Sequence, residues 1–427
     1  MSTPTSPAVV GLELSRRVSG LKPSVTVGFT NRAKEMKASG IDVLGFAAGE
    51  PDFDTPDFIK QAAIDAMRAG ETKYKPTLGD MPTREAIARK LTEENGIRGL
   101  TGHHVAIGCG GKHVLFEAMH ALIDPPVPGE VQAEVLLPVP AWVSYRPIAE
   151  LAGGRVVEIP AGPETDFKIS AEQLADAITE HSRVLVLNSP SNPCGTMYSE
   201  DELRAIASVV AEKAETVCPR LVVLTDEIYE KIAYAGIEHF SIGSVPEIAE
   251  RTITLNGMSK AYAMTGWRIG YCAMPGAFGA EFIKALGKLQ GQMTTNITSF
   301  NYAAMRAALK DGAADVEKMV GKFAERARLV KQRLDAIPGV MTPTPTGAFY
   351  VFPDVSGLFG KTSPGGKPIT CAMDLSEALL EEAHVAFVPG EDFGGCGGNH
   401  VRISFACGEE QINKGMDRFE EFVSKLT

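Results

Sequence analysis

The stretch Thr252–Gly270, TITLNGMSKAYAMTGWRIG, decides how this chain is interpreted. Its first four residues are β-branched or aliphatic, which favours a buried strand. Lys260 follows the end of that strand, after a turn at Asn256 and Gly257. Desolvation and nearby positive charge lower the pKa of a lysine, and the neutral amine can then attack a carbonyl carbon. An isolated lysine is usually a solvated surface residue, so the interpretation depends on the residues that accompany it.

Short strand-like runs alternate with amphipathic helical segments from about Thr101 onward. Such alternation predicts a largely parallel α/β sheet, whose strands are buried on both faces. The predicted strands are Val135–Leu137, Arg155–Ile159, Val184–Leu187, Leu221–Leu224, Thr252–Leu255 and Arg268–Ala273.

The pattern changes to a long helical period at Ala303–Ile337, which Pro338 and Gly339 stop. Shorter strand-like pieces follow at Ala348–Phe352 and His400–Phe405. We therefore expect a second, smaller α+β domain to begin near the start of the long helix. The Gly- and Pro-rich stretch Gly357–Pro368 is expected to be a surface loop.

Composition excludes several classes of protein. A chain of 427 residues with 44% hydrophobic content can bury a sizeable core, and its length favours two or more domains. The formal net charge of −11 argues against a surface that binds nucleic acid or anionic lipid. No run approaches the roughly 18 apolar residues of a membrane span. The opening Met1–Val10 lacks a signal-peptide pattern and is expected to be a disordered tail.

Cysteine and histidine usage adds two expectations. The seven cysteines are scattered and contain no Cys-x-x-Cys, which indicates reduced thiols in a cytoplasm. The pair His103 and His104 has no partner at metal-ligand spacing, so we assign no metal.

Polar residues follow two further buried strands. Asp226 closes the run that starts at Leu221, where a carboxylate would face a ligand at the carboxyl edge of a parallel sheet, although it could also cap the next helix. Tyr229 follows three residues later. Asn192 lies just beyond another strand, in NSPSNPCG, where the Asn-Pro pair alone would indicate only a turn.

Together these motifs resemble the class I aminotransferases of the fold-type I pyridoxal-phosphate family. The resemblance rests on four motifs in order: Asn192-Pro193-x-Gly195, Asp226-x-x-Tyr229, Ser259-Lys260 and Arg402. It covers nearly the whole chain, from Leu14 to the C-terminal helix. It implies a large domain with a mainly parallel seven-stranded sheet flanked by helices, and a smaller α+β domain. The expected segments are a tail at 1–13, an N-terminal segment at 14–50 that packs with the small domain, a large cofactor-binding domain at 51–302 and the small domain at 303–427.

The resemblance assigns roles around pyridoxal 5′-phosphate. Lys260 would carry the cofactor as a Schiff base and then act as general acid and base. Asp226 would pair with the pyridine nitrogen and make the ring an electron sink. Tyr229 and Asn192 would bind the ring hydroxyl, and Trp142 would stack on the ring, although a plain core tryptophan is the alternative.

The phosphate group would need donors and positive charge. Gly110-Gly111-Lys112 precedes a helical stripe, so backbone N–H groups at that helix start can hold an anion. Arg268 matches the phosphate arginine of the family, and Tyr74 matches a tyrosine that reaches the phosphate of the neighbouring subunit, which implies a homodimer with shared active sites. Gly257 departs from the family, which often has Ser or Thr there, and Ser259 could substitute for that contact.

Substrate contacts follow from the same resemblance. Arg402 would grip the α-carboxylate through two hydrogen bonds, and Trp142, Asn192 and the backbone of Gly49 would also meet the substrate.

The side-chain pocket most resembles that of the bacterial aspartate aminotransferase subgroup, which includes enzymes that also aminate prephenate. Lys112 could pair with a second carboxylate and Thr26 could bind it as the small domain closes; otherwise Lys112 is a helix-terminal lysine exposed to water. Cys194 replaces the usual Thr of Asn-Pro-Thr-Gly, and no functional loss is expected from it.

These observations predict a cytoplasmic enzyme that transfers an amino group from aspartate or glutamate to a 2-oxo acid by a ping-pong mechanism. The close variant accepts prephenate, and a lyase or decarboxylase on the same fold is the alternative. A regulator without catalysis is disfavoured, because its relatives carry a DNA-binding domain for which no room exists before Leu14.

Overall fold

The computed structural model describes residues 13–21, 25–234 and 236–427. The predicted tail at 1–13 lies outside these residues except for Glu13, as do Lys22, Pro23 and Ser24. The strands are β1 Leu44–Gly45, β2 Val105–Gly108, β3 Glu134–Val139, β4 Arg155–Pro160, β5 Ser182–Asn188, β6 Val222–Asp226, β7 Thr252–Gly257, β8 Gly270–Ala273, β9 Tyr350–Val351, β10 Val385–Ala386, β11 Val388–Pro389 and β12 Val401–Ser404.

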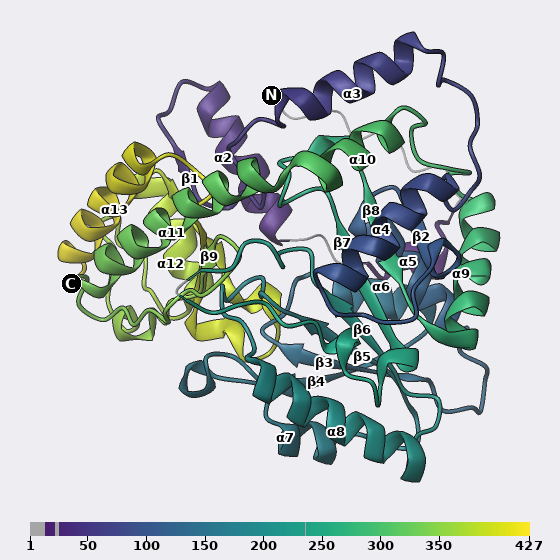
Figure 1. The fold of residues 1–427 in the computed structure, drawn as a ribbon. Helices are drawn as coiled ribbons and strands as arrows, with labels where there is room; N and C mark the ends of the chain where they lie inside the picture. The colour runs from purple at the N-terminus through teal and green to yellow at the C-terminus, as the bar shows by residue number, and fades with distance from the viewer. Residues whose placement is uncertain (1–12, 22–24, 235) are drawn as a thin grey trace.

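The α-helices lie on both sides of the largest sheet and around the C-terminal region (Figure 1). They are α1 Arg16–Ser19, α2 Val25–Ala38, α3 Asp57–Arg68, α4 Met81–Glu93, α5 Gly111–Leu122, α6 Tyr145–Ala152, α7 Ala171–Ala177, α8 Glu200–Thr216, α9 Gly276–Gly291, α10 Asn301–Asp311, α11 Ala313–Asp335, α12 Ala372–Ala378 and α13 Glu409–Ser424. Among the described residues, no helix is long and apolar enough to cross a membrane.

The largest sheet has seven strands in the order β2-β8-β7-β6-β5-β3-β4. The five strands from β7 to β4 run parallel, whereas β8 is antiparallel to both β7 and β2. The prediction of a largely parallel α/β sheet is therefore confirmed. Because the central strands are parallel, their carboxyl ends share one edge of the sheet, which is the usual place for a ligand.

Alternate residues of β5 pack on opposite faces of the sheet. Val184 and Val186 belong to a core with buried residues of α5, α6 and α9, and Leu185 and Leu187 belong to another with residues of α7 and α8. Figure 1 shows α7 and α8 on the side of the sheet away from α5 and α9. Burial on both faces explains why this strand reads as a continuous hydrophobic run.

Two strand predictions need correction. Strand β8 begins at Gly270, because Arg268 has a left-handed backbone with φ 56° after a 3₁₀ turn at Thr265–Trp267. Strand β4 is the edge strand and is largely exposed or half-buried, so the expected burial on both faces is wrong for Arg155–Ile159. The opposite edge strand, β2, was not predicted; it is only four residues long.

The long helical period at Ala303–Ile337 corresponds to two helices, α10 and α11, with a break at Gly312. A Cβ at Gly312 would lie 2.8 Å from the ring of Tyr262, so this position requires glycine. Buried residues of α10 share a core with residues of α3 and α4, including Ile59 and Ile87. The division into domains at residue 303 stays a prediction.

The C-terminal region builds its own core around the three-stranded sheet β11-β12-β9. Strand β12 is antiparallel to both neighbours, and the pieces predicted at Ala348–Phe352 and His400–Phe405 contain β9 and β12. The N-terminal strand β1 pairs in parallel with β10, so residues far apart in sequence meet there. This pairing carries the chain after α2 toward the carboxyl edge of the large sheet.

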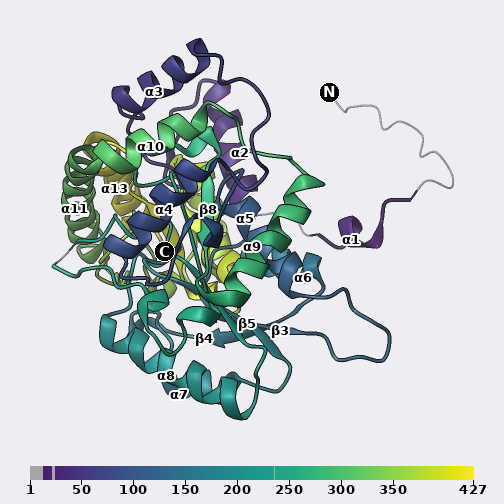
Figure 2. The same ribbon diagram turned by 45° about the vertical axis from the view of Figure 1, so that its right-hand side comes forward.

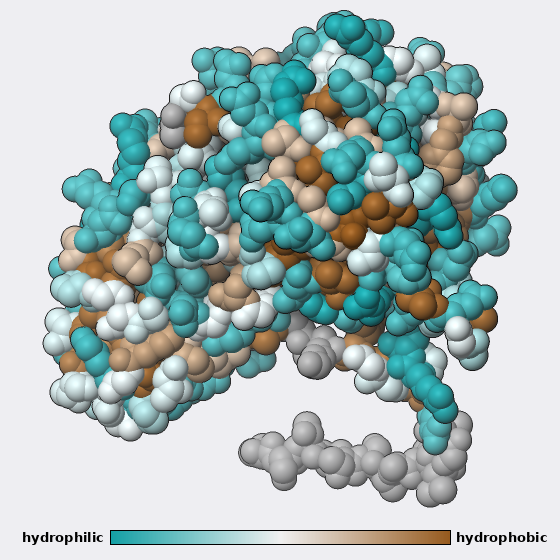
Figure 3. All heavy atoms as spheres, turned by 90° about the horizontal axis from the view of Figure 1, so that it is seen from below, coloured by the Kyte–Doolittle hydropathy of each residue, from teal (hydrophilic) through white to brown (hydrophobic). Residues whose placement is uncertain are grey.

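Apolar side chains also remain exposed on the surface. Figure 2 shows α1 standing away from the body of the molecule, and α1 has no buried residue. In Figure 3, apolar residues in brown are exposed between hydrophilic residues in teal. The exposed large apolar residues include Leu14, Val18, Leu21, Tyr74, Phe278 and Met293.

Candidate active site

The carboxyl edge of the large sheet brings the predicted residues together. Asn188 and Asp226 end neighbouring strands and are paired in register, and Asp226 is also paired with Leu255 on β7. Lys260 follows β7 after a short turn. The parallel register therefore explains how three separate motifs reach one place.

Lys260 points back toward the N-terminal segment. Its Nζ donates a hydrogen bond to the carbonyl oxygen of Gly49. The same Nζ lies 5.9 Å from the ring centroid of Tyr229 and 5.8 Å from that of Phe349. A Cβ at position 49 would lie 2.8 Å from the hydroxyl of Tyr350, so glycine is needed there.

The environment of Lys260 favours its neutral form. The pKa of its amine is lowered from 10.5 to about 8, mainly by burial and also by the positive charges of Arg402 and Arg268. The carboxylates of Glu50 and Asp226 act in the opposite direction. The result is an amine whose neutral fraction near neutral pH is far larger than that of an ordinary lysine, and the neutral form is the state that a nucleophilic lysine requires.

Asp226 is a buried carboxylate with two hydrogen-bond donors. The residue is 5% exposed, and its carboxylate accepts hydrogen bonds from the hydroxyl of Tyr145 at 2.8 Å and from the N–H of Ile228 at 3.2 Å. Burial raises the pKa of Asp226 to about 6, although the Tyr145 hydrogen bond and the charge of Lys260 lower it. Such a carboxylate can bind a protonated ring nitrogen, because the cation would restore the ionised state.

Arg402 forms a second, buried cationic centre, and its charge acts on Lys260. Its Nη1 donates to Asn192 Oδ1 at 3.1 Å and its Nη2 donates to the carbonyl of Ala47 at 2.7 Å. Its buried Nε has no hydrogen-bond partner among the described residues. Tyr350 lies beneath the guanidinium, 4.9 Å from its carbon, and hydrogen-bonds Tyr229 at 2.9 Å between the hydroxyls. Arg402 and Asn192 are therefore in direct contact, as a shared carboxylate site requires.

An anion cradle lies at the N-terminus of α5. Here the term covers the backbone of Cys109, Gly110, Gly111 and Lys112 together with the Arg268 guanidinium. Arg268 Nη1 donates to the carbonyl of Thr265 at 2.9 Å, and a Cβ at Gly110 would collide with this guanidinium. Within the described part of the chain, the N–H groups of Gly111 and Lys112 have no acceptor. Free N–H groups at a helix start beside an arginine are suited to a phosphate dianion.

Lys112 and Trp142 form the opposite wall. The Nζ of Lys112 lies 4.9 Å from the Trp142 ring centroid, and the Trp142 ring meets Tyr145 edge-on at 5.4 Å between centroids. Burial lowers the pKa of Lys112, and the charge of Arg268 lowers it further. Since Tyr145 bonds Asp226, these contacts join Trp142 to the carboxylate.

Comparison with known proteins decides the family. The model for aminotransferases of class I and II matches residues 41–419. A probable aspartate/prephenate aminotransferase of Rhizobium leguminosarum bv. phaseoli is 42% identical, over 96% of this chain and 98% of its own. The crystal structure of the aspartate aminotransferase of Rhizobium meliloti superposes with a TM-score of 0.90 at 38% identity, over 98% of this chain and 100% of its own. The chain belongs to the class I and II aminotransferases. The structure of the Thermus thermophilus aspartate aminotransferase with maleate superposes with a TM-score of 0.86 at 39% identity, over 96% of this chain and 100% of its own.

Two departures from the usual aminotransferase motifs have a structural explanation. Gly257 stands where Ser or Thr was expected, and a Cβ there would lie 2.8 Å from the carbonyl of Ile269. Cys194 is fully buried in a small apolar core with Phe352 and Phe393, so its thiol packs as a hydrophobic residue. No hydrogen bond of the Ser259 side chain is present among the described residues, so its substitution for the missing contact stays a prediction.

Two predicted residues of this aminotransferase lie apart from the central contacts. Thr26 donates from its N–H and its hydroxyl to Asp392 Oδ2, at 3.2 and 3.1 Å. Burial lowers the pKa of Arg402, and the charge of Asp392 is one of the smaller effects that oppose this, so Thr26 is linked to the site through Asp392. Tyr74 is 87% exposed, and its predicted contact with a neighbouring subunit stays a prediction.

Sequence reasoning missed four residues that complete the site. They are Tyr145, Asn188, Tyr350 and Glu50. Tyr145 was visible three residues after Trp142, and Asn188 opens the Asn-Pro motif, where its side chain accepts from the N–H of Asn192 at 2.9 Å. Nothing in the sequence indicates that Tyr350 reaches Tyr229, because 121 residues separate them.

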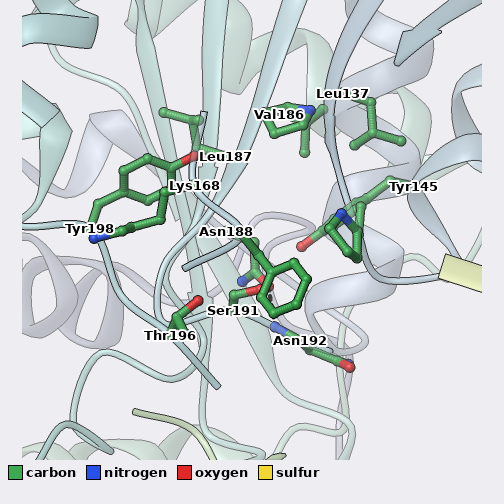
Figure 4. A pocket seen from close by; sticks show the side chains of 14 residues that line it. Leu137, Tyr145, Lys168, Val186, Leu187, Asn188, Ser191, Asn192, Thr196 and Tyr198 are labelled. Atoms are coloured by element: carbon green, nitrogen blue, oxygen red, sulfur yellow. Dashed lines mark hydrogen bonds between the residues drawn. The ribbon is translucent and has the colours of Figure 1, made fainter. Parts of the chain in front are cut away.

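A small cavity lies behind the Asn-Pro motif (Figure 4). Its volume of about 30 Å³ has room for a water molecule or two and not for an amino acid. Tyr145, Asn188 and Asn192 line it and border the site, while Lys168 and Tyr198 lie on its other side. The cavity therefore lies beside the site and is not the substrate pocket.

One cluster outside the site has side chains that could ligate a metal. Glu227, Glu230 and His239 have their ligand atoms within 4.8 Å of one another. The Lys90 ammonium bonds to Glu230 and lies among these groups, and Asn95 donates to both carboxylates. Because a lysine already supplies the positive charge, we assign no metal to this cluster.

Proposed function

We propose that this aminotransferase moves an amino group between a dicarboxylic amino acid, aspartate or glutamate, and a 2-oxo acid, using pyridoxal 5′-phosphate. The observation that carries the proposal is that one site holds both Lys260, whose amine has a pKa of about 8, and Arg402, a buried guanidinium with an unpartnered Nε whose charge acts on that amine. The guanidinium would hold the α-carboxylate and the amine would act on the adjacent carbon.

The residues present fit the cofactor by the chemistry of their donors. Lys260 offers the amine and Asp226 a buried carboxylate for the ring nitrogen. Asn192 contacts Arg402, and the Tyr229 hydroxyl contacts that of Tyr350. The anion cradle offers free N–H groups and a cation for the phosphate. Pyridoxal phosphate, when bound, supplies an electron sink conjugated to the substrate amino group.

Each residue then has a defined task in amino transfer. Arg402 binds and orients the α-carboxylate, and Asn192 fixes the guanidinium through its amide oxygen. Lys260 Nζ takes the proton from the substrate α-carbon as a general base, since its amine is partly neutral, and the ammonium so formed then delivers that proton as a general acid at the other end of the 1,3-shift. Asp226 holds a positive charge at the far end of the site, and Tyr145 keeps that carboxylate oriented. The transfer occurs in two halves, so the expected kinetics are ping-pong.

Lys112 supports a dicarboxylic substrate. It is a cation at the wall of the site, held over Trp142, and a second carboxylate would offset its repulsion by Arg268. Solved relatives agree in kind, since the Thermus thermophilus structure contains maleate, a dicarboxylate. The Rhizobium leguminosarum relative is named for aspartate and prephenate, which makes prephenate a second candidate acceptor.

We also propose that the enzyme is a cytoplasmic homodimer with shared active sites. Exposed Tyr74, Met293 and the apolar residues of α1 would be covered by a second copy. All seven cysteines are free, as expected for a reducing compartment.

A donor and acceptor panel tests the proposal. Aspartate or glutamate with 2-oxoglutarate or oxaloacetate should give turnover, and prephenate should be tested as a second acceptor. The turnover rate of Lys260→Ala should be lower by several orders of magnitude. Release of ammonia or carbon dioxide from the amino acid alone would indicate a lyase or decarboxylase instead. Turnover of Lys260→Ala at the parental rate would refute the proposal.

A further inference from the structure

His113 lies directly behind the anion cradle. It is in the first turn of α5, and its side chain is 12% exposed. Its Nδ1 accepts a hydrogen bond from the N–H of Cys109 at 3.2 Å. Cys109 belongs to the short loop that joins β2 to α5, so the imidazole ties the helix to the loop that precedes it.

The Cys109 N–H contact adds to other supports of this loop, since Arg268 Nη2 donates to the carbonyl of Cys109 at 3.5 Å and the N–H of Val114 donates to that of Gly110 at 3.2 Å. Gly110 has φ 92°, and its N–H donates to Gly108 at 2.8 Å, so the chain turns sharply there. A Cβ at Gly108 would lie 2.9 Å from His113 Nδ1, which shows how closely the ring packs on the loop backbone. Removing the imidazole would leave a void and a half-buried N–H without its acceptor, and such a group is costly to leave unpaired.

Glu117 faces the other nitrogen of the imidazole. The Nε2 of His113 lies 3.6 Å from Glu117 Oε1, and neither atom has a hydrogen-bond partner among the described residues. Because Nδ1 is an acceptor, the ring proton belongs on Nε2, facing the carboxyl group. Burial lowers the pKa of His113 and raises the pKa of Glu117 to about 8, so both groups favour their neutral forms.

Among the described residues, burial is the one cause that shifts the pKa of His113 or of Glu117. Gln290 of α9 donates to the carbonyls of Thr77 and Ile107, and its own Oε1 lies near Gly108. Cys272 of β8 is the titratable group that faces Glu117, and burial raises the pKa of its thiol. The ring therefore stays a neutral acceptor for the loop.

We propose that His113 is a positioning residue that holds the Cys109–Gly110 loop of the anion cradle in the shape that binds phosphate. The inference rests on the proposed function, which assigns a phosphate to the cradle. His113 does not touch the anion; it acts through the backbone of Cys109.

Dissociation constants of the full-length protein for inorganic phosphate, pyridoxal phosphate and pyridoxal test the inference. His113→Leu should bind both phosphate ligands about tenfold more weakly, which corresponds to about 1.4 kcal/mol, and should bind pyridoxal as the parent does. His113→Asn should restore most of the loss, since its Oδ1 can replace Nδ1 as acceptor. His120→Leu is the matched control on the same helix and should change nothing; its Nδ1 contacts only the carbonyl of Phe116.

The outcomes distinguish a failure of the anion cradle from a failure of the role of His113. If Arg268→Ala leaves phosphate binding unchanged, the cradle itself is wrong, and with it the phosphate part of the proposed function. If Arg268→Ala weakens phosphate binding but His113→Leu does not, only the role of His113 is overturned. An equal loss for pyridoxal and pyridoxal phosphate, or an Asn variant as poor as the Leu variant, would also overturn it. Should the Leu variant fail to fold, the Asn variant decides alone.

Discussion

Replacing Lys112 with methionine removes one charge and keeps most of the side-chain stem against Trp142. The ammonium lies 4.9 Å from the Trp142 ring centroid, at the wall of the site, and the residue as a whole is exposed although partial burial lowers the pKa of its amine. A charge pair about 4 Å apart is worth about 1 kcal/mol in water and about 4 kcal/mol near a protein surface. Because solvent screens an exposed lysine, we expect about 1–2 kcal/mol from a second substrate carboxylate.

That energy corresponds to a loss of about 5- to 30-fold in kcat/KM for aspartate and glutamate. Alanine has no second carboxylate, so its kcat/KM should change less than twofold and serves as the control within each variant. Lys112→Arg should keep most of the preference for dicarboxylic substrates. Increasing the ionic strength should reduce the preference of the parent enzyme and leave that of Lys112→Met nearly unchanged.

The assay is steady-state kinetics with each amino donor at a fixed 2-oxo acid, for the parent and both variants. Equal losses for aspartate and alanine would refute the role of Lys112 in recognising the second carboxylate. If the substrate preference of Lys112→Met falls with ionic strength as steeply as that of the parent enzyme, the electrostatic explanation is contradicted even if the losses for aspartate and alanine differ. Either result would return Lys112 to the class of exposed lysines at a helix start.

Two further predictions concern the ionisable groups of the site. Tyr145→Phe removes a hydrogen bond that favours ionised Asp226, so the pKa of Asp226 should rise from about 6 by roughly one unit and the acidic limb of cofactor binding should move to higher pH; an unmoved limb would contradict this. The pKa of Lys260 is lowered from 10.5 to about 8, so the folded state binds fewer protons between these values and the cost of burying the charge is present in full below pH 8. Lys260→Met should therefore raise the melting temperature of the cofactor-free protein at pH 7, and the difference should shrink toward pH 10. A lower melting temperature of the variant at pH 7 would contradict a destabilising burial of the Lys260 charge.

Much of the fold was predictable because it depends on local pattern. The hydrophobic runs at Val184–Leu187 and Thr252–Leu255 became central strands, since only a strand buried on both faces needs such a composition. The edge strands were predicted less well: β4 is half exposed and β2 has four residues, too few for a pattern. The predicted strand Arg268–Ala273 begins two residues too early, because Arg268 has a positive φ and belongs to the turn before the strand.

The sequence alone determined which chemical groups stand at the ends of the strands. Lys260, Asp226 and Asn192 each follow a hydrophobic run, and parallel strands end at one edge, so their meeting needed no coordinates. The tertiary structure alone decided their partners: Tyr145 on Asp226, and Tyr350 on Tyr229. The reason is physical, because strand formation depends on neighbours in sequence, whereas a side-chain hydrogen bond depends on distances that are set only when distant elements pack.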